Sequence, residues 1–143
     1  MKQLVLHQEH WDAMLHHVES CRPFEGCGLL SGRGDVVHAV LPITNEEQSR
    51  TRYRMDPSEQ LRALNDMEDA DMELLGIFHS HPADPVGDRR PAEGPSETDI
   101  AESAYPVVYI IWSRADGGWQ ARGFRIEAGE ALEVPLRIAT VEE

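Results

Sequence analysis

Apolar and polar residues recur along this chain with the period of a helix in two places. Residues 8–20 carry apolar side chains at i, i+3, i+4 and i+7, the spacing of one face of an amphipathic helix. These side chains belong to Trp11, Met14, Leu15 and Val18. Residues 56–59 read Asp-Pro-Ser-Glu, which places an N-cap acid, a proline at the first helical position and a glutamate at the third. A second helix is therefore expected from Asp56 to about Ala70.

Short apolar segments bounded by turn residues predict the strands. They are residues 26–31, 36–41, 73–81, 106–113, 119–126 and 130–138, with a further short strand at residues 3–6. Segment 106–113, PVVYIIWS, is the most apolar and is expected near the centre of the sheet, whereas segment 130–138 is expected to form a last edge strand. A short helix is expected to begin at Ser96 and to stop before Pro106. Helices interleaved with about six strands predict an α/β or α+β domain in which helices flank a mixed central sheet.

Length and composition narrow the class of protein. The chain has 143 residues, so we expect one domain over residues 1–143. Hydrophobic residues make up 41% of it, as in folded globular proteins, and no apolar run is long enough to cross a membrane. The N-terminal sequence MKQLVLHQEHWD is too briefly apolar for a signal peptide, so a cytoplasmic location is expected.

The charged and thiol-bearing residues exclude some functions. A formal charge of -13 argues against nucleic-acid binding, and it leaves open either a solvated acidic surface or a partner with a basic face. The alternating arginines of the RTRYR segment, residues 50–54, fit a charged edge strand or a strip that guides an extended substrate tail. Cys21 and Cys27 are not spaced as C-x-x-C and predict neither a disulfide framework nor a zinc ribbon.

Histidines stand out at the end of one predicted strand. Residues 76–82 read GIFHSHP, and His79 and His81 are two residues apart, so they point to the same face of the strand. Two neutral imidazoles there fit a zinc-chelating pair, although an H-x-H sequence also occurs by chance in strands. Five other histidines lack a ligand pattern and are expected at the surface. They are His7, His10, His16, His17 and His38.

Two acids elsewhere in the chain complete a possible catalytic set. A catalytic zinc needs a third protein ligand, for which Asp99 in PSETD is the candidate; Ser96 and Asp99 also fit a helix capping box. Glu25 in PFEGCGLL directly precedes a predicted strand and would lie at a sheet end, either as a catalytic acid or as an exposed loop residue.

Taken together, E-x-C-G-L-L, then H-S-H-P at the end of a strand, then P-S-x-T-D, resembles the motif of the JAMM (MPN+) metallopeptidases. The resemblance covers most of the chain, including Thr44–Asn45 and the segment YRMDPSEQL, and is similar to the small stand-alone type that removes cysteine from a ubiquitin-like sulfur carrier. It implies the MPN/JAMM architecture, which is cytidine deaminase-like, and one Zn²⁺ per chain bound by His79, His81 and Asp99. It also implies that Glu25 acts as general base and that Ser96 donates a hydrogen bond to the oxyanion.

The expected activity is therefore hydrolysis of the amide bond after the C-terminal Gly–Gly tail of a ubiquitin-like sulfur-carrier protein, by a zinc metallopeptidase or isopeptidase. The alternative is a non-catalytic zinc-binding MPN module that interacts with ubiquitin-like proteins. Other zinc and metal proteins fit less well: nucleoside deaminases need H-x-E and P-C-x-x-C, and cupins need a histidine after His81, which this chain lacks. The segment between His81 and Ser96 is longer than usual for the family and is expected to form a flap beside the metal.

Overall fold

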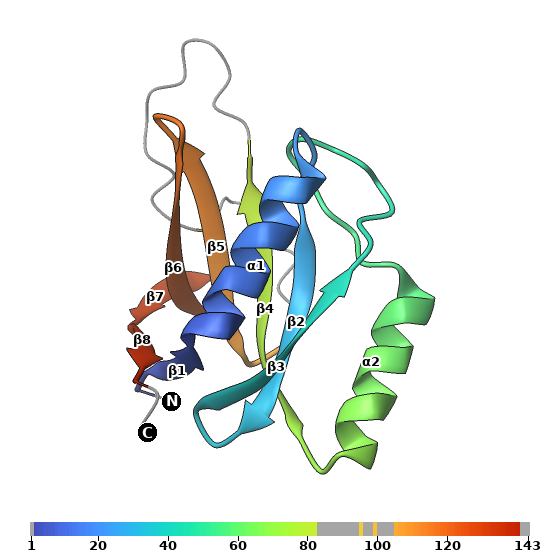
Figure 1. The fold of residues 1–143 in the computed structure, drawn as a ribbon, viewed down its shortest axis with the longest axis vertical. Helices are drawn as coiled ribbons and strands as arrows, with labels where there is room; N and C mark the ends of the chain where they lie inside the picture. Colours follow the sequence, from blue (N-terminus) through green and yellow to red (C-terminus); the bar gives the residue numbers. More distant parts are fainter. Residues whose placement is uncertain (1, 83–94, 96–98, 100–104, 141–143) are drawn as a thin grey trace.

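The computed structural model describes residues 2–82, 95, 99 and 105–140 (Figure 1). Over these residues the chain forms eight named strands and two named helices. In chain order they are β1 (Leu4–His7), α1 (Gln8–Cys21), β2 (Cys27–Arg33), β3 (Val36–Ile43), α2 (Pro57–Asp69), β4 (Glu73–His81), β5 (Val108–Ala115), β6 (Gly118–Glu127), β7 (Glu130–Val134) and β8 (Leu136–Ala139). None of the helices in the described part of the chain is long and apolar enough to span a membrane.

The two helices begin where the sequence predicts. At the start of α2 the Asp56 carboxylate accepts hydrogen bonds from the backbone N–H groups of Ser58 (2.9 Å) and Glu59 (3.0 Å), and Pro57 occupies the first turn. Glu59 does not turn back to the cap as in a capping box, because its carboxylate accepts a bond from Thr44 N–H instead. This bond ties the start of α2 to the end of β3.

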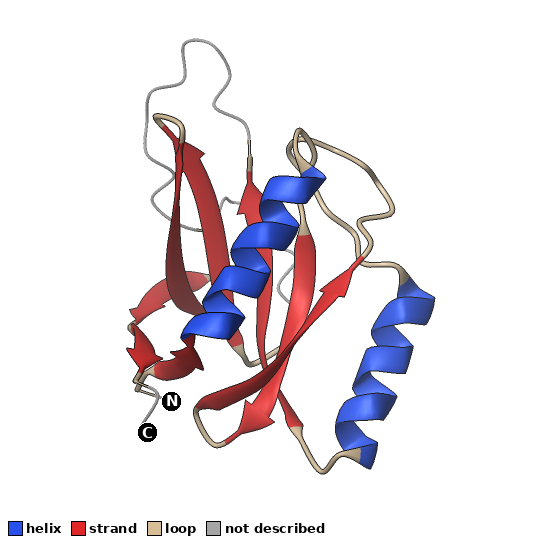
Figure 2. Ribbon diagram, viewed as in Figure 1, coloured by secondary structure: helices blue, strands red, loops and turns tan. Residues whose placement is uncertain are grey.

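All eight strands belong to one sheet in the order β7-β6-β5-β4-β2-β3-β1-β8. Figure 2 shows the strands in red and the two helices in blue. The sheet is mixed: β4 and β5 are parallel, as are β1 with β3 and with β8, and the other pairs are antiparallel. The predicted mixed sheet flanked by helices is confirmed, and β5 is an interior strand as expected.

Alternation along the strands gives the sheet two apolar faces, each covered by one helix. One core combines Met14 and Val18 of α1 with residues such as Leu30 and Phe78. The other combines Ala63 and Met67 of α2 with residues such as Leu29, Cys27 and Ile77. Neighbouring residues in a strand point to opposite faces, so α1 and α2 lie on opposite sides of the sheet.

Some details of the prediction were wrong. The expected edge strand 130–138 is two strands, β7 and β8, which lie at opposite ends of the sheet order and are separated by Pro135. Proline has no N–H to donate to a ladder, so it separates the two strands instead of continuing one. The RTRYR segment is not a named strand; an isolated bridge joins Asn45 to Met55 across it. The sheet has eight strands where about six were expected.

The prediction that His10 lies at the surface was also wrong. It is buried, with 7% of its surface exposed, under the first turn of α1. Its Nδ1 accepts a hydrogen bond from His7 N–H (3.1 Å), and its Nε2 lies 3.2 Å from the carbonyl oxygen of His38. This histidine is thus a buried part of the helix cap and not a surface residue.

Candidate metal centre

The register between β2 and β4 brings the sequence motifs together. These strands are antiparallel, with Cys27 opposite His79, so the start of β2 lies beside the end of β4. The Ser80 hydroxyl oxygen accepts a hydrogen bond from Gly26 N–H (2.8 Å), and Ser80 N–H donates to the Gly26 carbonyl (3.0 Å). Glu25, next to Gly26, is therefore held at the same end of the sheet as the two histidines.

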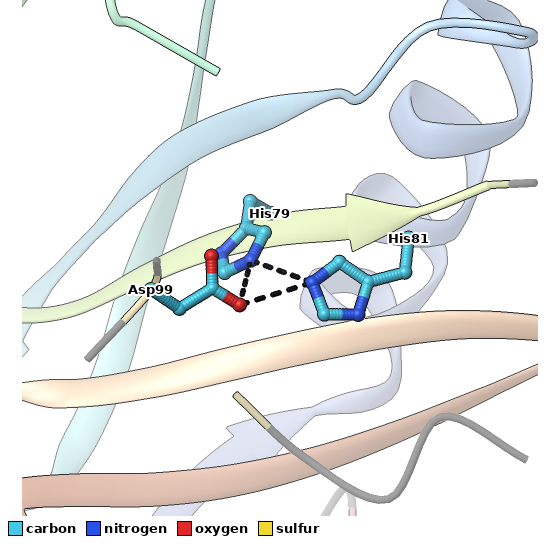
Figure 3. Close-up of side chains that lie close together, drawn as sticks. All are labelled: His79, His81 and Asp99. Atoms are coloured by element: carbon cyan, nitrogen blue, oxygen red, sulfur yellow. Dashed lines mark hydrogen bonds and ion pairs between the residues drawn. The ribbon is translucent and has the colours of Figure 1, made fainter. Parts of the chain in front are cut away.

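Asp99 reaches the histidines from the crossover between the parallel strands β4 and β5. Figure 3 shows its carboxylate facing both imidazole rings. Asp99 Oδ2 lies 3.2 Å from His79 Nε2 and 3.0 Å from His81 Nε2, and the two Nε2 atoms are 3.2 Å apart. Two parallel strands need a long crossover connection, and the one between β4 and β5 contains Asp99. Its carboxylate therefore lies beside the end of β4 that carries His79 and His81.

These three atoms have the spacing that a zinc site needs. With ligands at about 2.0–2.1 Å in a tetrahedral shell, neighbouring ligand atoms are about 3.3 Å apart. The observed separations of 3.0–3.2 Å form one triangular face of such a shell with little rearrangement. Two imidazole nitrogens and one carboxylate oxygen are also a donor set typical of catalytic zinc. The residues present therefore fit a zinc ion.

The environment of His79 favours the neutral form that binds metal. His79 has 1% of its side chain exposed, and burial lowers its pKa, although Asp99 acts in the opposite direction. His81 is more accessible, with 21% of its side chain exposed. The triad is thus closed on the His79 side and more open to solvent beside His81.

Glu25 is a buried acid at this end of the sheet. Only 2% of it is exposed, and its Oε1 has no hydrogen-bond partner among the residues that the structure describes. Burial first, and then the nearby charge of Asp99, raise the pKa of the Glu25 carboxyl to about 9. Its backbone is fixed on both sides: the N–H donates to Ser49 O (2.7 Å), and the carbonyl accepts from Asn45 Nδ2 (3.0 Å).

The cysteines do not offer an alternative nucleophile. Burial raises the pKa of Cys27 to about 12 and also raises that of Cys21. Both side chains are thiols at neutral pH, whereas a cysteine nucleophile acts as the thiolate. Cys27 is fully buried.

Tyr53 is a feature of the site that the sequence motifs did not reveal. Its ring stacks on the His79 imidazole, with centroids 4.5 Å apart and planes inclined by 22°. It also lines a cavity of about 310 Å³, together with Met55, Ile77, Tyr105 and Tyr109 among others. Burial raises the pKa of the Tyr53 phenol, so its hydroxyl stays protonated. Tyr53 belongs to the segment YRMDPSEQL that carries part of the family resemblance, but it has no metal-ligand spacing, so the sequence assigned it no role.

Ser96 and the expected flap between His81 and Ser96 lie outside the described residues, except for Pro82 and Pro95. The structure therefore brings together four of the five motif residues that the sequence selected. They are Glu25, His79, His81 and Asp99.

Comparison with known proteins identifies the family. Residues 7–126 match the family model for prokaryotic homologs of the JAB domain (Prok-JAB). The chain belongs to this family. The predicted resemblance to JAMM/MPN proteins is thereby confirmed.

Curated relatives and solved structures of this family align with most of the chain. The CysO-cysteine peptidase of Mycobacterium tuberculosis is 33% identical over 139 residues, which cover 94% of this chain and 90% of the relative. A probable TtuB-protein conjugate cleaving protease of Thermus thermophilus is 38% identical over 111 residues, 77% of this chain and 67% of the relative. The solution structure of a protein from Desulfitobacterium hafniense superposes with a TM-score of 0.80 at 33% identity, covering 99% of this chain and 97% of that one.

Proposed function

We propose that this Prok-JAB protein is a zinc-dependent peptidase or isopeptidase that hydrolyses the amide bond after the C-terminal Gly–Gly tail of a ubiquitin-like sulfur-carrier protein. The observation that carries the proposal is the convergence of His79, His81 and Asp99 at one strand end beside the buried Glu25. The relatives support the substrate class, because one is named for CysO-cysteine and another for TtuB-protein conjugates.

In this proposal His79, His81 and Asp99 hold one zinc ion per chain. Zinc, when bound, supplies Lewis-acid polarisation of the scissile carbonyl and lowers the pKa of a water molecule toward neutrality. Glu25 takes the proton of the attacking water and then delivers it to the leaving amine nitrogen. A nearby cation favours the carboxylate, so metal binding would lower the high pKa of Glu25 into a range suited to this role.

Ser96 is proposed to donate a hydrogen bond to the oxyanion that forms at the scissile carbonyl. One such donor contributes on the order of 10²-fold or more to turnover. A diglycine tail suits a buried centre of this kind, because without side chains its backbone can approach the strand end closely.

The proposal is tested with a small sulfur-carrier protein from the same genome, extended by one cysteine after its Gly–Gly end. The substrate is incubated with the wild-type chain and with Glu25→Gln, each with and without a chelator, and its mass is measured. Loss of one cysteine residue in the untreated wild type alone, with turnover in Glu25→Gln reduced by about 10²-fold or more, supports the proposal.

The same experiment separates the enzyme from a binding module. If the zinc-loaded wild type co-elutes with the carrier in gel filtration but leaves the mass of the carrier unchanged, the peptidase is refuted and a non-catalytic interaction domain is favoured. Cleavage that survives complete removal of zinc would instead refute the metal-dependent mechanism.

A further inference from the structure

The imidazole of His79 lacks the support that metal-binding histidines usually have. Such a histidine normally donates its second ring N–H to a carboxylate, a carbonyl or a water, and this bond fixes the ring orientation. The Nε2 atom of His79 faces His81 and Asp99, whereas its buried Nδ1 has no hydrogen-bond partner within the described part of the chain. Among the described residues, the plane of this ring is therefore set by a contact other than a hydrogen bond to Nδ1.

Tyr53 makes that contact. Its ring lies 4.5 Å from the His79 ring and is inclined to it by only 22°, so the two rings are stacked face to face. A flat neighbour at this distance opposes rotation of the imidazole about its side-chain bonds, because rotation would drive the ring edge into the tyrosine.

Tyr53 is itself held by the side chain of Asn45. The Asn45 Oδ1 atom accepts a hydrogen bond from Arg54 N–H (2.9 Å), and its Nδ2 donates to the carbonyl of Arg52 (3.1 Å). One amide thus bonds to the residues directly before and after Tyr53. The same Nδ2 donates to the carbonyl of Glu25 (3.0 Å), and Asn45 is itself buried, with 9% exposed.

We propose that Tyr53, clamped by Asn45, is a positioning residue that fixes the His79 imidazole for metal binding in place of a hydrogen bond to Nδ1. The proposal rests on the proposed function, because it requires that His79 be a zinc ligand. It extends that function by assigning a role to two residues of the segment between β3 and α2, and it makes Asn45 the common anchor of Tyr53 and Glu25.

The test compares zinc affinities, measured by competition with a chromophoric chelator. Tyr53→Phe keeps the stacked ring, whereas Tyr53→Met keeps apolar volume without a plane. Tyr109→Met is the control, because Tyr109 lines the same cavity from β5 and is buried, whereas Tyr53 is half-buried. Loss of a group that orients a metal ligand typically weakens binding about 10- to 100-fold. We expect a weakening of this size in Tyr53→Met and little change in Tyr53→Phe or Tyr109→Met.

The outcomes distinguish this proposal from the proposed function. A wild type that binds no zinc overturns both. A wild type that binds zinc while Tyr53→Met binds it equally well, or while Tyr109→Met weakens it as much, overturns the role of Tyr53 alone.

A second measurement does not depend on the folding of Tyr53→Met. Because Tyr53 touches His79, zinc addition to the wild type should produce a tyrosine difference band in the ultraviolet spectrum, and Tyr53→Phe should lack it. A wild type that binds zinc without such a band, or a band that persists in Tyr53→Phe, contradicts the proposal.

Discussion

Glu25→Gln should stabilise the metal-free protein at neutral and alkaline pH. The substitution keeps the shape of the side chain and removes its ionisation. In the folded chain the pKa of Glu25 is about 9, against 4.5 for an ordinary glutamate. Between these two values the folded state keeps a proton that the unfolded state releases, so the stability of the wild type falls as pH rises through this window. The glutamine variant lacks this loss.

The magnitude follows from the same two pKa values. At about pH 7.5 the folded state is still protonated, whereas the unfolded state lies about 3 pH units above its pKa of 4.5. This difference lowers the unfolding free energy of the wild type by about 4 kcal/mol. The glutamine amide adds buried N–H groups, and an unpaired donor costs about 1–3 kcal/mol. Subtracted from about 4 kcal/mol, this cost leaves the variant more stable than the wild type by about 1–3 kcal/mol of unfolding free energy. The pH dependence is the sharper quantity, because the advantage of glutamine should grow by about 1.4 kcal/mol per pH unit.

The assay is urea unfolding of both proteins with a chelator present, at several values between about pH 5.5 and about pH 8.5, where the linkage applies. All other titrating groups are shared and cancel in the difference between the two curves. A difference that stays constant across this range would show that Glu25 titrates normally in the folded state and would refute the reasoning. With zinc present the slope should shrink, because the cation favours the carboxylate.

Three other changes test the site and its scaffold. Asp99→Asn should remove most of the bound zinc by deleting the anionic ligand, as measured by metal analysis of the purified protein; full zinc content would exclude Asp99 as a ligand. Ser80→Ala leaves the Gly26 N–H without its acceptor, so it should cost about 1–3 kcal/mol of stability, measured by denaturant titration, and reduce turnover while zinc is retained. Asp56→Ala removes the acceptor of two N–H groups and should lower the unfolding free energy by about 1 kcal/mol without affecting zinc affinity, as measured by denaturant titration.

Local signals in the sequence predicted much of the fold. The Asp56 cap and the apolar spacing of residues 8–20 placed both helices, and the apolar run before His79 placed the strand that presents it. The split at Pro135 was missed because the pairing of β8 with β1 depends on residues more than a hundred positions away. Local pattern carries no information about which distant strand a segment will join.

Only those residues of the site that have a recognisable spacing in the sequence could be predicted from it. His79 and His81 are paired within one strand, and Asp99 and Glu25 were found through the motif taken as a whole. Tyr53 and Asn45 act through a ring stack and an amide clamp that form only after the chain between β3 and α2 is folded. The burial of Glu25 likewise depends on the pairing of β2 with β4, which no single segment encodes.

The parallel pairing of β1 with β8 has a practical consequence for handling the molecule. Leu4 of β1 lies opposite Leu136 of β8, and β1 meets β3 at Val36 (Figure 1). Val36 is the end of β3 farthest from the metal ligands, because the other end of β3, Ile43, pairs with Cys27, which in turn pairs with His79. The first and last strands therefore share the pole of the molecule remote from the metal ligands. A fluorescent protein, an affinity handle or a surface tether joined beyond either strand should leave the entrance to the centre clear, so the chain can be displayed on a sensor while its substrate approaches from the opposite pole.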